Sequence, residues 1–185
     1  MRQAQTRVHP QGEAGPASLE TSRLAMRRLR ADDAAFYLAL VTDPDWIRFI
    51  GDKKLSTLEQ ARKSLEDGPI AAYARTGHGL LAVERRGEGV PLGICGLIKR
   101  DTLPDVDLGF AFLPQHRRQG YAEESARATL EHARHVLGLR RVVGITSPEN
   151  DASGRLLEKL GMRLERTFTM PGETRLTRLY AIEWP

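Results

Sequence analysis

In the middle of the chain, short apolar segments alternate with polar turn sequences. Residues 79–84, 91–99 and 106–113 are apolar segments of strand length, and a turn sequence at residues 86–89 separates the first two. Strands joined by short turns pair in antiparallel fashion. This part of the chain therefore predicts an antiparallel meander of three strands.

A strand and a helix are predicted ahead of the meander. Residues 24–29 alternate imperfectly between apolar and polar side chains, as in a strand. Asp32 or Asp33 then caps a helix. Pro44 ends this helix, because proline restricts the residue before it and lacks an N–H donor.

A second helix is predicted to begin at Ser56. Ser56 and Glu59 have the spacing of a capping box, and the Gly68-Pro69 pair marks the end of the helix. The apolar residues 46–50 between the two helices have two interpretations. They pack into the core, or they form one wall of a substrate pocket.

The period changes to that of a helix after residue 120. Between residues 120 and 137, small or apolar residues recur at intervals of three and four, and Gly138 closes the pattern. A strand rich in β-branched residues follows at 141–146. A strand, a helix and a further strand in this order predict a right-handed crossover between two locally parallel strands.

One more helix and two strands complete the chain. Asn150 opens the helix, Gly161 closes it, and residues 162–170 and 174–183 have the pattern of closing strands. Together the elements predict a mixed α+β fold, with helices on both faces of a largely antiparallel sheet.

Length and composition predict one globular domain. The chain has 185 residues, of which 41% are hydrophobic, and we expect a flexible tail at residues 1–18 and a domain at 19–185. The longest apolar run, at residues 34–41, is too short to span a bilayer, and the N-terminus lacks the apolar segment of a signal peptide. We therefore expect a cytoplasmic protein without a membrane partner.

The net charge of +4 raises the alternative of a nucleic-acid binder. Basic and acidic residues are intermixed, only 6% of residues are aromatic, and no nucleic-acid-binding module is recognisable. This alternative therefore ranks last. The single cysteine, Cys95, lies in an apolar strand and is interpreted as a packing residue rather than a nucleophile.

The loop at residues 113–122 carries the first sign of function. It combines a proline, two arginines and a glycine. The loop contains no carboxylate, and the first one after it is Glu123. A short basic loop that leads into a helix directs backbone N–H groups and the helix N-terminus at one point, which favours an anion, above all phosphate. The sequence therefore predicts a site for a phosphorylated ligand.

This loop, the crossover and the segment at 150–162 together resemble the GNAT acetyltransferase superfamily. Arg117, Gly120 and Ala122 match the family signature Arg/Gln-x-x-Gly-x-Gly/Ala, and the later segment matches in its Asn-x-x-Ser and Leu-Gly-Met residues. The resemblance covers roughly residues 20–184 and is closest to the branch that includes ribosomal-protein N-terminal acetyltransferases. It implies the GNAT fold, in which a central parallel pair of strands splays apart.

The resemblance also implies a binding mode for acetyl-CoA. Its pyrophosphate would cross the loop, where Gly120 allows close approach and Arg117 and Arg118 add charge. Its pantetheine arm would pair with the exposed backbone of the strand before the loop. No metal is implied. The residues assigned to the cofactor are Phe110, Ala111, Phe112, Arg117, Arg118, Gln119, Gly120, Tyr121, Ala122, Asn150 and Ser153.

The implied reaction is direct attack of a primary amine on the thioester through a tetrahedral oxyanion. By analogy, a backbone N–H near Phe112 donates to the oxyanion. Many relatives carry a tyrosine that protonates the leaving thiolate, but Leu157 stands at that position here. Ser153 is the remaining candidate acid, or it only bonds the backbone at the helix start. Asn150 binds the pantetheine arm, caps the helix or does both.

The sequence does not identify the general base. A water molecule is one candidate. The histidines are not candidates: His116 lies in the loop and adds charge there, and His78, His132 and His135 are interpreted as surface residues. The acidic residues on or beside predicted strands are Glu84, Asp101, Asp105, Asp107 and Glu173.

The leading interpretation is an acetyl-CoA-dependent N-acetyltransferase that acts on a protein N-terminal α-amine or a small-molecule amine. The acceptor would enter opposite the cofactor, between residues 46–50 and the loop at 171–175. The alternative, motivated by Leu157, is a non-catalytic acyl-CoA-binding or regulatory module. A monomer and a homodimer are both compatible with the sequence.

Overall fold

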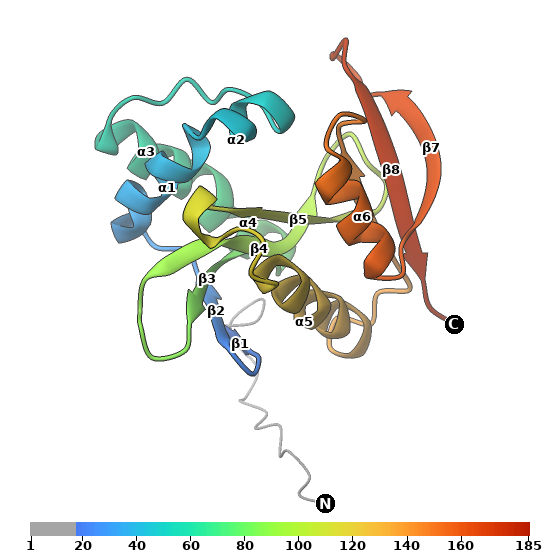
Figure 1. Cartoon of the computed structure of the whole chain (residues 1–185), viewed down its shortest axis with the longest axis horizontal. Helices are drawn as coiled ribbons and strands as arrows, with labels where there is room; N and C mark the ends of the chain where they lie inside the picture. The colour runs from blue at the N-terminus through green and yellow to red at the C-terminus, as the bar shows by residue number, and fades with distance from the viewer. Residues whose placement is uncertain (1–17) are drawn as a thin grey trace, which may run out of the picture.

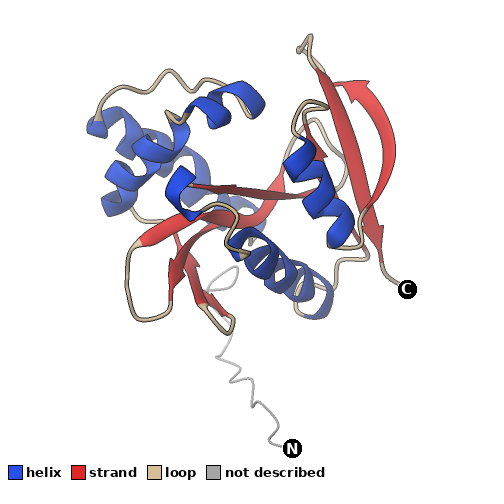
Figure 2. Ribbon diagram, viewed as in Figure 1, coloured by secondary structure: helices blue, strands red, loops and turns tan. Residues whose placement is uncertain are grey.

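The computed structural model describes residues 18–185 (Figure 1). The tail predicted at residues 1–18 therefore lies outside the described residues, apart from Ser18, which begins the first strand. Within the described range, helices cover both faces of one sheet (Figure 2).

The sheet has eight strands in the order β1-β2-β3-β4-β5-β6-β8-β7. Neighbouring strands are antiparallel except for β5 and β6, which are parallel. The predicted mixed fold with a central parallel pair is confirmed. The strands are β1 (Ser18–Glu20), β2 (Leu24–Arg28), β3 (Leu80–Arg85), β4 (Pro91–Lys99), β5 (Val106–Phe112), β6 (Arg141–Thr146), β7 (Arg163–Thr169) and β8 (Leu176–Glu183).

The helices fall into an N-terminal group and a pair that follows the parallel strands. Figure 1 shows α1 and α3 on one side of β4 and β5, and α5 on the other. The helices are η1 (Ala31–Asp33), α1 (Ala34–Val41), α2 (Pro44–Phe49), α3 (Leu58–Leu65), η2 (Glu66–Ile70), α4 (Ala71–Thr76), η3 (Pro114–His116), α5 (Tyr121–His135) and α6 (Asp151–Lys159).

Alternation along the strands divides the core between the two faces of the sheet. On β3, Val83 belongs to the cluster that includes Leu130 of α5. Its neighbour Ala82 belongs to the opposite cluster, with Leu40 of α1 and Leu65 of α3. The sheet is thus fixed from both sides where it leads up to the parallel pair.

The second predicted helix begins one residue later than its capping-box pattern suggested. Thr57 is the N-cap: its Oγ1 accepts from the N–H of Gln60 at 3.2 Å, and the side chain of Gln60 accepts from the N–H of Thr57 at 3.2 Å. The cap predicted at Ser56 and Glu59 is therefore wrong. Two overlapping Ser/Thr-x-x-Glu/Gln patterns occur here, and in the observed one Ser56 also donates to Gln60.

The predicted stop at Gly68-Pro69 is wrong as well. The chain continues through the wider turn η2, which contains Pro69, and through α4 to Gly77 at φ 73°. A π-type turn accommodates a proline that cannot donate an N–H. Tyr73 anchors this continuation, because its hydroxyl donates to the Leu80 carbonyl and accepts from the Leu29 N–H at 2.9 Å.

None of the helices in residues 18–185 has the length and apolar character that crossing a bilayer requires.

Candidate functional site

The two parallel strands form a fork. Their ladder has one pair, Asp107 with Val143, whereas β4 and β5 stay paired along the whole of β5. The N–H of Leu113 donates to the carbonyl of Leu92 in β4 at 3.0 Å. Because backbone groups alternate in direction along a strand, those of Phe110 and Phe112 face the fork. The backbone of Ala111 faces β4 instead.

The loop after β5 has an unusual backbone. Arg118 has φ 59° and Gly120 has φ 81°, both in the left-handed region. Gly120 is the N-cap of α5 and offers no side-chain cap. The first N–H groups of α5 therefore have no partner within the helix, and the positive end of its dipole is at the loop. The loop and the uncapped helix start are therefore present as predicted, and the anion site there stays a prediction.

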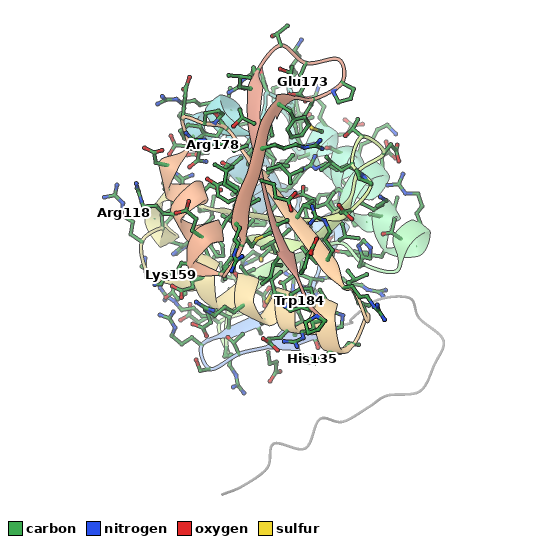
Figure 3. The ribbon with its side chains drawn as sticks, turned by 90° about the vertical axis from the view of Figure 1, so that its right-hand side faces the viewer. Arg118, His135, Lys159, Glu173, Arg178 and Trp184 are labelled. Carbon is green, nitrogen blue, oxygen red and sulfur yellow. The ribbon has the colours of Figure 1, made fainter. Side chains whose placement is uncertain are left out.

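Arg117 does not point its charge at this predicted anion site. Its Nε donates to the Phe112 carbonyl at 2.9 Å, and its two terminal nitrogens bond Asp45 at 2.6 Å and Asp43 at 2.5 Å. Arg118, by contrast, is exposed and reaches away from the ribbon in Figure 3. The two arginines of the signature segment therefore have different tasks. One ties the loop to α2, and the other leaves its charge in solvent.

The helix α2 was missed in the sequence. The apolar residues 46–50 obscured the start signals, which are Asp43 as N-cap and Pro44 at the first position. The Asp43 carboxylate accepts from the N–H groups of Asp45 and Trp46 and also binds Arg117. Trp46 is buried in the core, whereas Ile47 and Ile50 are 39% and 55% exposed. The core interpretation is thus confirmed for Trp46, and the pocket-wall interpretation stays a prediction for the exposed residues.

The start of α6 brings together Asn150 and Ser153. The Asn150 side chain accepts from the N–H of Ser153 at 3.1 Å, so Asn150 is the N-cap. Within residues 18–185, no hydrogen bond to the Ser153 hydroxyl is found. Leu157 is buried and contacts the position of Gly144 on β6. It offers no donor.

A further hydroxyl near this helix start escaped the sequence reasoning. Tyr180 of β8 is 2% exposed, and its hydroxyl oxygen would lie 2.9 Å from a Cβ at Gly154. Among the described residues no hydrogen bond to this hydroxyl is found, although a buried tyrosine usually has a partner. The signal lay in Gly154, because a glycine on the buried face of a helix leaves room for a close neighbour.

Among the candidate bases, Asp107 has the distinctive environment. It lies where the strands part and is 1% exposed; one carboxylate oxygen accepts from Arg100 at 2.7 Å. Its other oxygen has no hydrogen-bond partner in the part of the chain that the structure describes. Burial raises the pKa of Asp107 to about 6, against the opposing effects of Arg100 and of the nearby Ile145 N–H. The carboxylate therefore changes charge close to neutral pH.

The other candidate bases are occupied or remote. Glu84 binds Arg27, and Asp105 binds Arg141. Asp101 is exposed, and Glu173 lies at the tip of the β7–β8 hairpin (Figure 3). The carboxylates of the first two are therefore already engaged in ion pairs.

Two earlier interpretations of titratable side chains have different outcomes. Cys95 is fully buried and burial raises the pKa of its thiol to about 11, so its interpretation as a packing residue is confirmed. His78 and His132 are half-buried, and burial lowers the pKa of each. Their interpretation as surface residues is therefore wrong. His78 lies on the inner side of the turn before β3, and His132 lies on the inner side of α5.

An exposed rim of side chains lies on α2, the helix that Arg117 ties to the loop, and on two later segments of the chain. Arg48 of α2 forms an ion pair with Glu149 in the β6–α6 connection at 3.1 Å. Arg175 from the β7–β8 hairpin donates to the Arg48 carbonyl. Three segments far apart in the sequence therefore meet through Arg48. Residues 46–50 and 171–175 are therefore neighbours in space, and the acceptor entrance between them stays a prediction.

A hollow of about 350 Å³ lies away from the loop, at the start of β6. It is lined by Leu103, Val143 and Arg141 among others. Arg141 is already paired with Asp105, Glu165 and Glu183. The charges of this hollow satisfy one another, so the fork has the stronger claim to be the functional site.

Comparison with known proteins agrees with the fork and the loop. Residues 23–163 match the family model described as "Acetyltransferase (GNAT) domain". The chain belongs to the GNAT acetyltransferase family and is an N-acetyltransferase, a class of enzyme that uses acetyl-CoA as its acyl donor.

Individual relatives support this assignment. The chain is 28% identical over 149 residues to the uncharacterized N-acetyltransferase YoaA of Bacillus subtilis, covering 80% of this chain and 83% of YoaA. A GNAT-family acetyltransferase from Bacillus anthracis superposes with a TM-score of 0.75 at 27% identity, covering 90% of this chain and 98% of that one. The ribosomal L7/L12 α-N-protein acetyltransferase RimL, solved with coenzyme A, has a TM-score of 0.76 at 16% identity, with 90% and 97% covered. At that identity RimL shows a shared fold.

Proposed function

We propose that this N-acetyltransferase holds acetyl-CoA with its pyrophosphate at the loop before α5 and its pantetheine arm in the fork. The observation that carries the proposal is the fork itself, in which β5 keeps one ladder pair with β6. The backbone groups of Phe110 and Phe112 face the gap, and an amide-bearing arm supplies N–H and C=O groups as an added strand does. The uncapped N-terminus of α5 supports the phosphate end.

The residues first assigned to the cofactor divide by what they offer. Gln119, Gly120, Tyr121 and Ala122 offer backbone at the loop and the helix start, and Arg118 offers a free charge. Arg117 holds the loop in place, and Ala111 drops out of the set because its backbone is turned to β4.

Phe110 and Phe112 have separate tasks in this proposal. The thioester is at the end of the arm that is remote from the pyrophosphate. Phe112 lies next to the loop, and Arg117 already occupies its carbonyl. We therefore assign the Phe112 N–H to the arm and the Phe110 N–H, two residues deeper, to the oxyanion.

Asp107 is the proposed base. An acceptor amine reaches the site as an ammonium and must lose a proton before it attacks the thioester carbon. A buried carboxylate with a pKa of about 6 and one free oxygen suits this task. It accepts the proton directly or through a water molecule. The tetrahedral intermediate then collapses, and the C–S bond breaks.

The thiolate that leaves needs a proton. Ser153 is the donor proposed from the sequence, and Tyr180 adds a second hydroxyl at the same helix turn. Leu157 supplies none. We propose that these two hydroxyls together protonate the thiolate of CoA, with Asn150 ordering the turn that carries Ser153.

The acceptor is a primary amine, either a peptide α-amine or a small molecule. The exposed Ile47 and Ile50, together with Arg48, Glu149 and Arg175, give its entrance both apolar and charged groups. An entrance of this kind suits an amine attached to a larger polar molecule.

Calorimetry with CoA and a thiol-release assay with acetyl-CoA test the proposal. The amine panel contains peptides with free N-termini, polyamines and aminoglycosides. We expect CoA to bind and at least one amine to be acetylated. Failure of CoA to bind would overturn the proposed cofactor site, and CoA binding without thiol release from any amine would favour a non-catalytic module.

A further inference from the structure

The cofactor loop is held in a conformation that a free loop would rarely adopt. Arg118 is a non-glycine residue with positive φ, and Gly120 follows two residues later with φ 81°. A non-glycine residue in such a region is strained and persists where its surroundings determine it. Arg117 provides one such restraint from the α2 side. The opposite side of the loop has a restraint as well.

That second restraint comes from the turn between β1 and β2, about a hundred residues earlier in the chain. Glu124, in the first turn of α5, accepts four hydrogen bonds from this turn. Their donors are Thr21 Oγ1 at 2.6 Å, Ser22 Oγ at 3.1 Å, Arg23 N at 3.0 Å and Arg23 Nε at 2.6 Å. Burial raises the pKa of Glu124, but these bonds outweigh burial and lower it to about 2. The carboxylate is therefore ionised over the whole physiological range.

Arg23 extends from this carboxylate to three consecutive residues of the cofactor loop. Its Nη1 donates to the Gln119 carbonyl at 3.0 Å. Its Nη2 lies 3.1 Å from the position of a Cβ at Gly120. Its guanidinium lies over the ring of Tyr121, 4.9 Å from the centroid. One planar side chain thus fixes the residues that lead into the helix N-terminus.

We propose that Arg23 is a positioning residue for the cofactor, acting through the loop at residues 119–121. This inference rests on the proposed function, in which that loop receives the pyrophosphate of CoA. Arg23 aims the backbone N–H groups at the pyrophosphate before the ligand arrives. Pre-organisation of this kind lowers the entropic cost of binding. The signature segment alone would not identify Arg23, because it lies in the β1–β2 turn.

The inference separates two acyl donors. S-Acetylpantetheine carries the same thioester and arm as acetyl-CoA but lacks the pyrophosphate. Loss of Arg23 is expected to disturb the conformation of the loop at residues 119–121. In the proposed site this loop contacts the pyrophosphate of acetyl-CoA, which S-acetylpantetheine lacks. We expect Arg23→Gln to raise the Kd for CoA and the KM for acetyl-CoA by about tenfold or more, the effect of losing charge-assisted hydrogen bonds. The kcat/KM with S-acetylpantetheine stays within about twofold of the unchanged protein.

Three further variants complete the experiment. Arg23→Lys keeps the charge but not the planar fork, so we expect it to fail to restore CoA affinity. Glu124→Gln is expected to weaken CoA binding in the same direction, because Arg23 loses its anchor. Arg86→Gln is the matched control. Arg86 contacts Glu20 and the Thr21 carbonyl of the same region, and the substitution removes one positive charge without changing a contact to the loop. Its CoA affinity should not change.

Thermal unfolding of every variant accompanies the binding data. A lower Tm with unchanged CoA affinity in Arg23→Gln would overturn the inference, since the arginine would then only stabilise the fold. Full affinity in Arg23→Lys would overturn it too, because charge alone would suffice. Equal losses with both acyl donors would place the effect outside the loop and also count against it. If the unchanged protein does not bind CoA, the proposed function fails, and this inference fails with it.

Discussion

The two sides of the fork are held together in different ways. On the cofactor side, Arg117 and Arg23 each make several hydrogen bonds to the loop and to carboxylates beside it. On the acceptor side, the contact between Arg48 and Glu149 joins side chains that are 61% and 67% exposed. Exposed ion pairs contribute little to stability. The cofactor side is therefore fixed, whereas the acceptor side can rearrange at small cost.

This difference suits a transferase whose donor is constant and whose acceptor varies. A fixed loop binds the same pyrophosphate each time without reorganisation. A rim of exposed side chains adapts to different amines, or changes in sequence without disturbing the fold. Asp107 lies at the base of the fork, where the two sides meet.

The largest effect is expected for Asp107→Asn. Loss of a general base lowers kcat by about 10²–10⁴-fold. The pKa of Asp107 is raised to about 6, so the carboxylate is protonated below that pH and becomes a base above it. We expect kcat/KM for the unchanged protein to rise with pH up to about 6 and to lose this rise in the variant. Thiol release between pH 5 and 8 measures both.

Asp105→Asn is the control for that prediction. Asp105 lies at the start of the same strand and is paired with Arg141, so its loss should leave the pH profile unchanged. Unaltered kcat and pH dependence in Asp107→Asn would exclude Asp107 as the base and leave a water molecule in that role.

Two glycines with the same φ angle, one on each proposed side of the fork, allow a direct test of the difference between the two sides. Gly120 in the cofactor loop and Gly172 in the β7–β8 hairpin both have φ 81°. Gly120→Glu places a negative charge and a strained side chain against the proposed pyrophosphate, so we expect CoA affinity to fall by about a hundredfold or more. Gly172→Glu carries the same backbone strain and charge at a position where a Cβ has no neighbour within 4 Å, and it should bind CoA normally. Calorimetry compares the two, and equal losses would contradict the division between the sides.

A smaller effect is expected at the hydroxyls beside α6. Ser153→Ala and Tyr180→Phe should each lower kcat by about tenfold, because one hydroxyl remains to protonate the thiolate, and the double variant should lose more. The KM for acetyl-CoA should stay within about twofold. Tyr37→Phe is the control, since Tyr37 is as buried as Tyr180 but packs in the cluster of α1 and α3. A double variant with normal kcat would assign the proton to solvent.

The smallest effect is expected at the acceptor rim. Arg48→Ala removes the ion pair with Glu149 and should change the KM for the amine by a few-fold, about the effect of one exposed charge contact. The Kd for CoA and the Tm should not change. Arg62→Ala is the control, because Arg62 is a similarly exposed arginine whose partner is Asp32 on the far side of α1. If Arg48→Ala weakens CoA binding as Arg23→Gln is expected to do, the two sides are not independent.

The sequence predicted the strand, loop and helix start around Gly120 better than the side-chain contacts of the loop, and particular residues show why. The loop follows from neighbouring residues: a strand, two arginines, Gly120 and a helix pattern. Arg117 was expected at the phosphates because its partners could not be seen. Asp43 and Asp45 lie more than seventy residues away, on either side of the Pro44 that was interpreted as a helix end. The same limit applies to Tyr180, whose hydroxyl meets Gly154 through the pairing of β6 and β8.

Errors in the predicted elements have a local cause. The capping-box pattern occurs twice around Ser56 and Thr57, and either choice satisfies the sequence rule. Gly68-Pro69 is a stop signal by composition, but the buried Tyr73 holds the next helical turn in place. In the second case burial decides between alternatives of nearly equal local free energy.

The sequence by itself determined most of the strands and helices in their order along the chain, the family, and the loop that leads into the N-terminus of α5. Those features depend on residues within one or two turns of each other. The tertiary structure decided that Arg118 rather than Arg117 is free, that the carboxylate of Asp107 is buried at the fork, and that the hydroxyl of Tyr180 faces α6. Ion pairing and desolvation depend on what surrounds a group in space, and neither can be read from its neighbours along the chain.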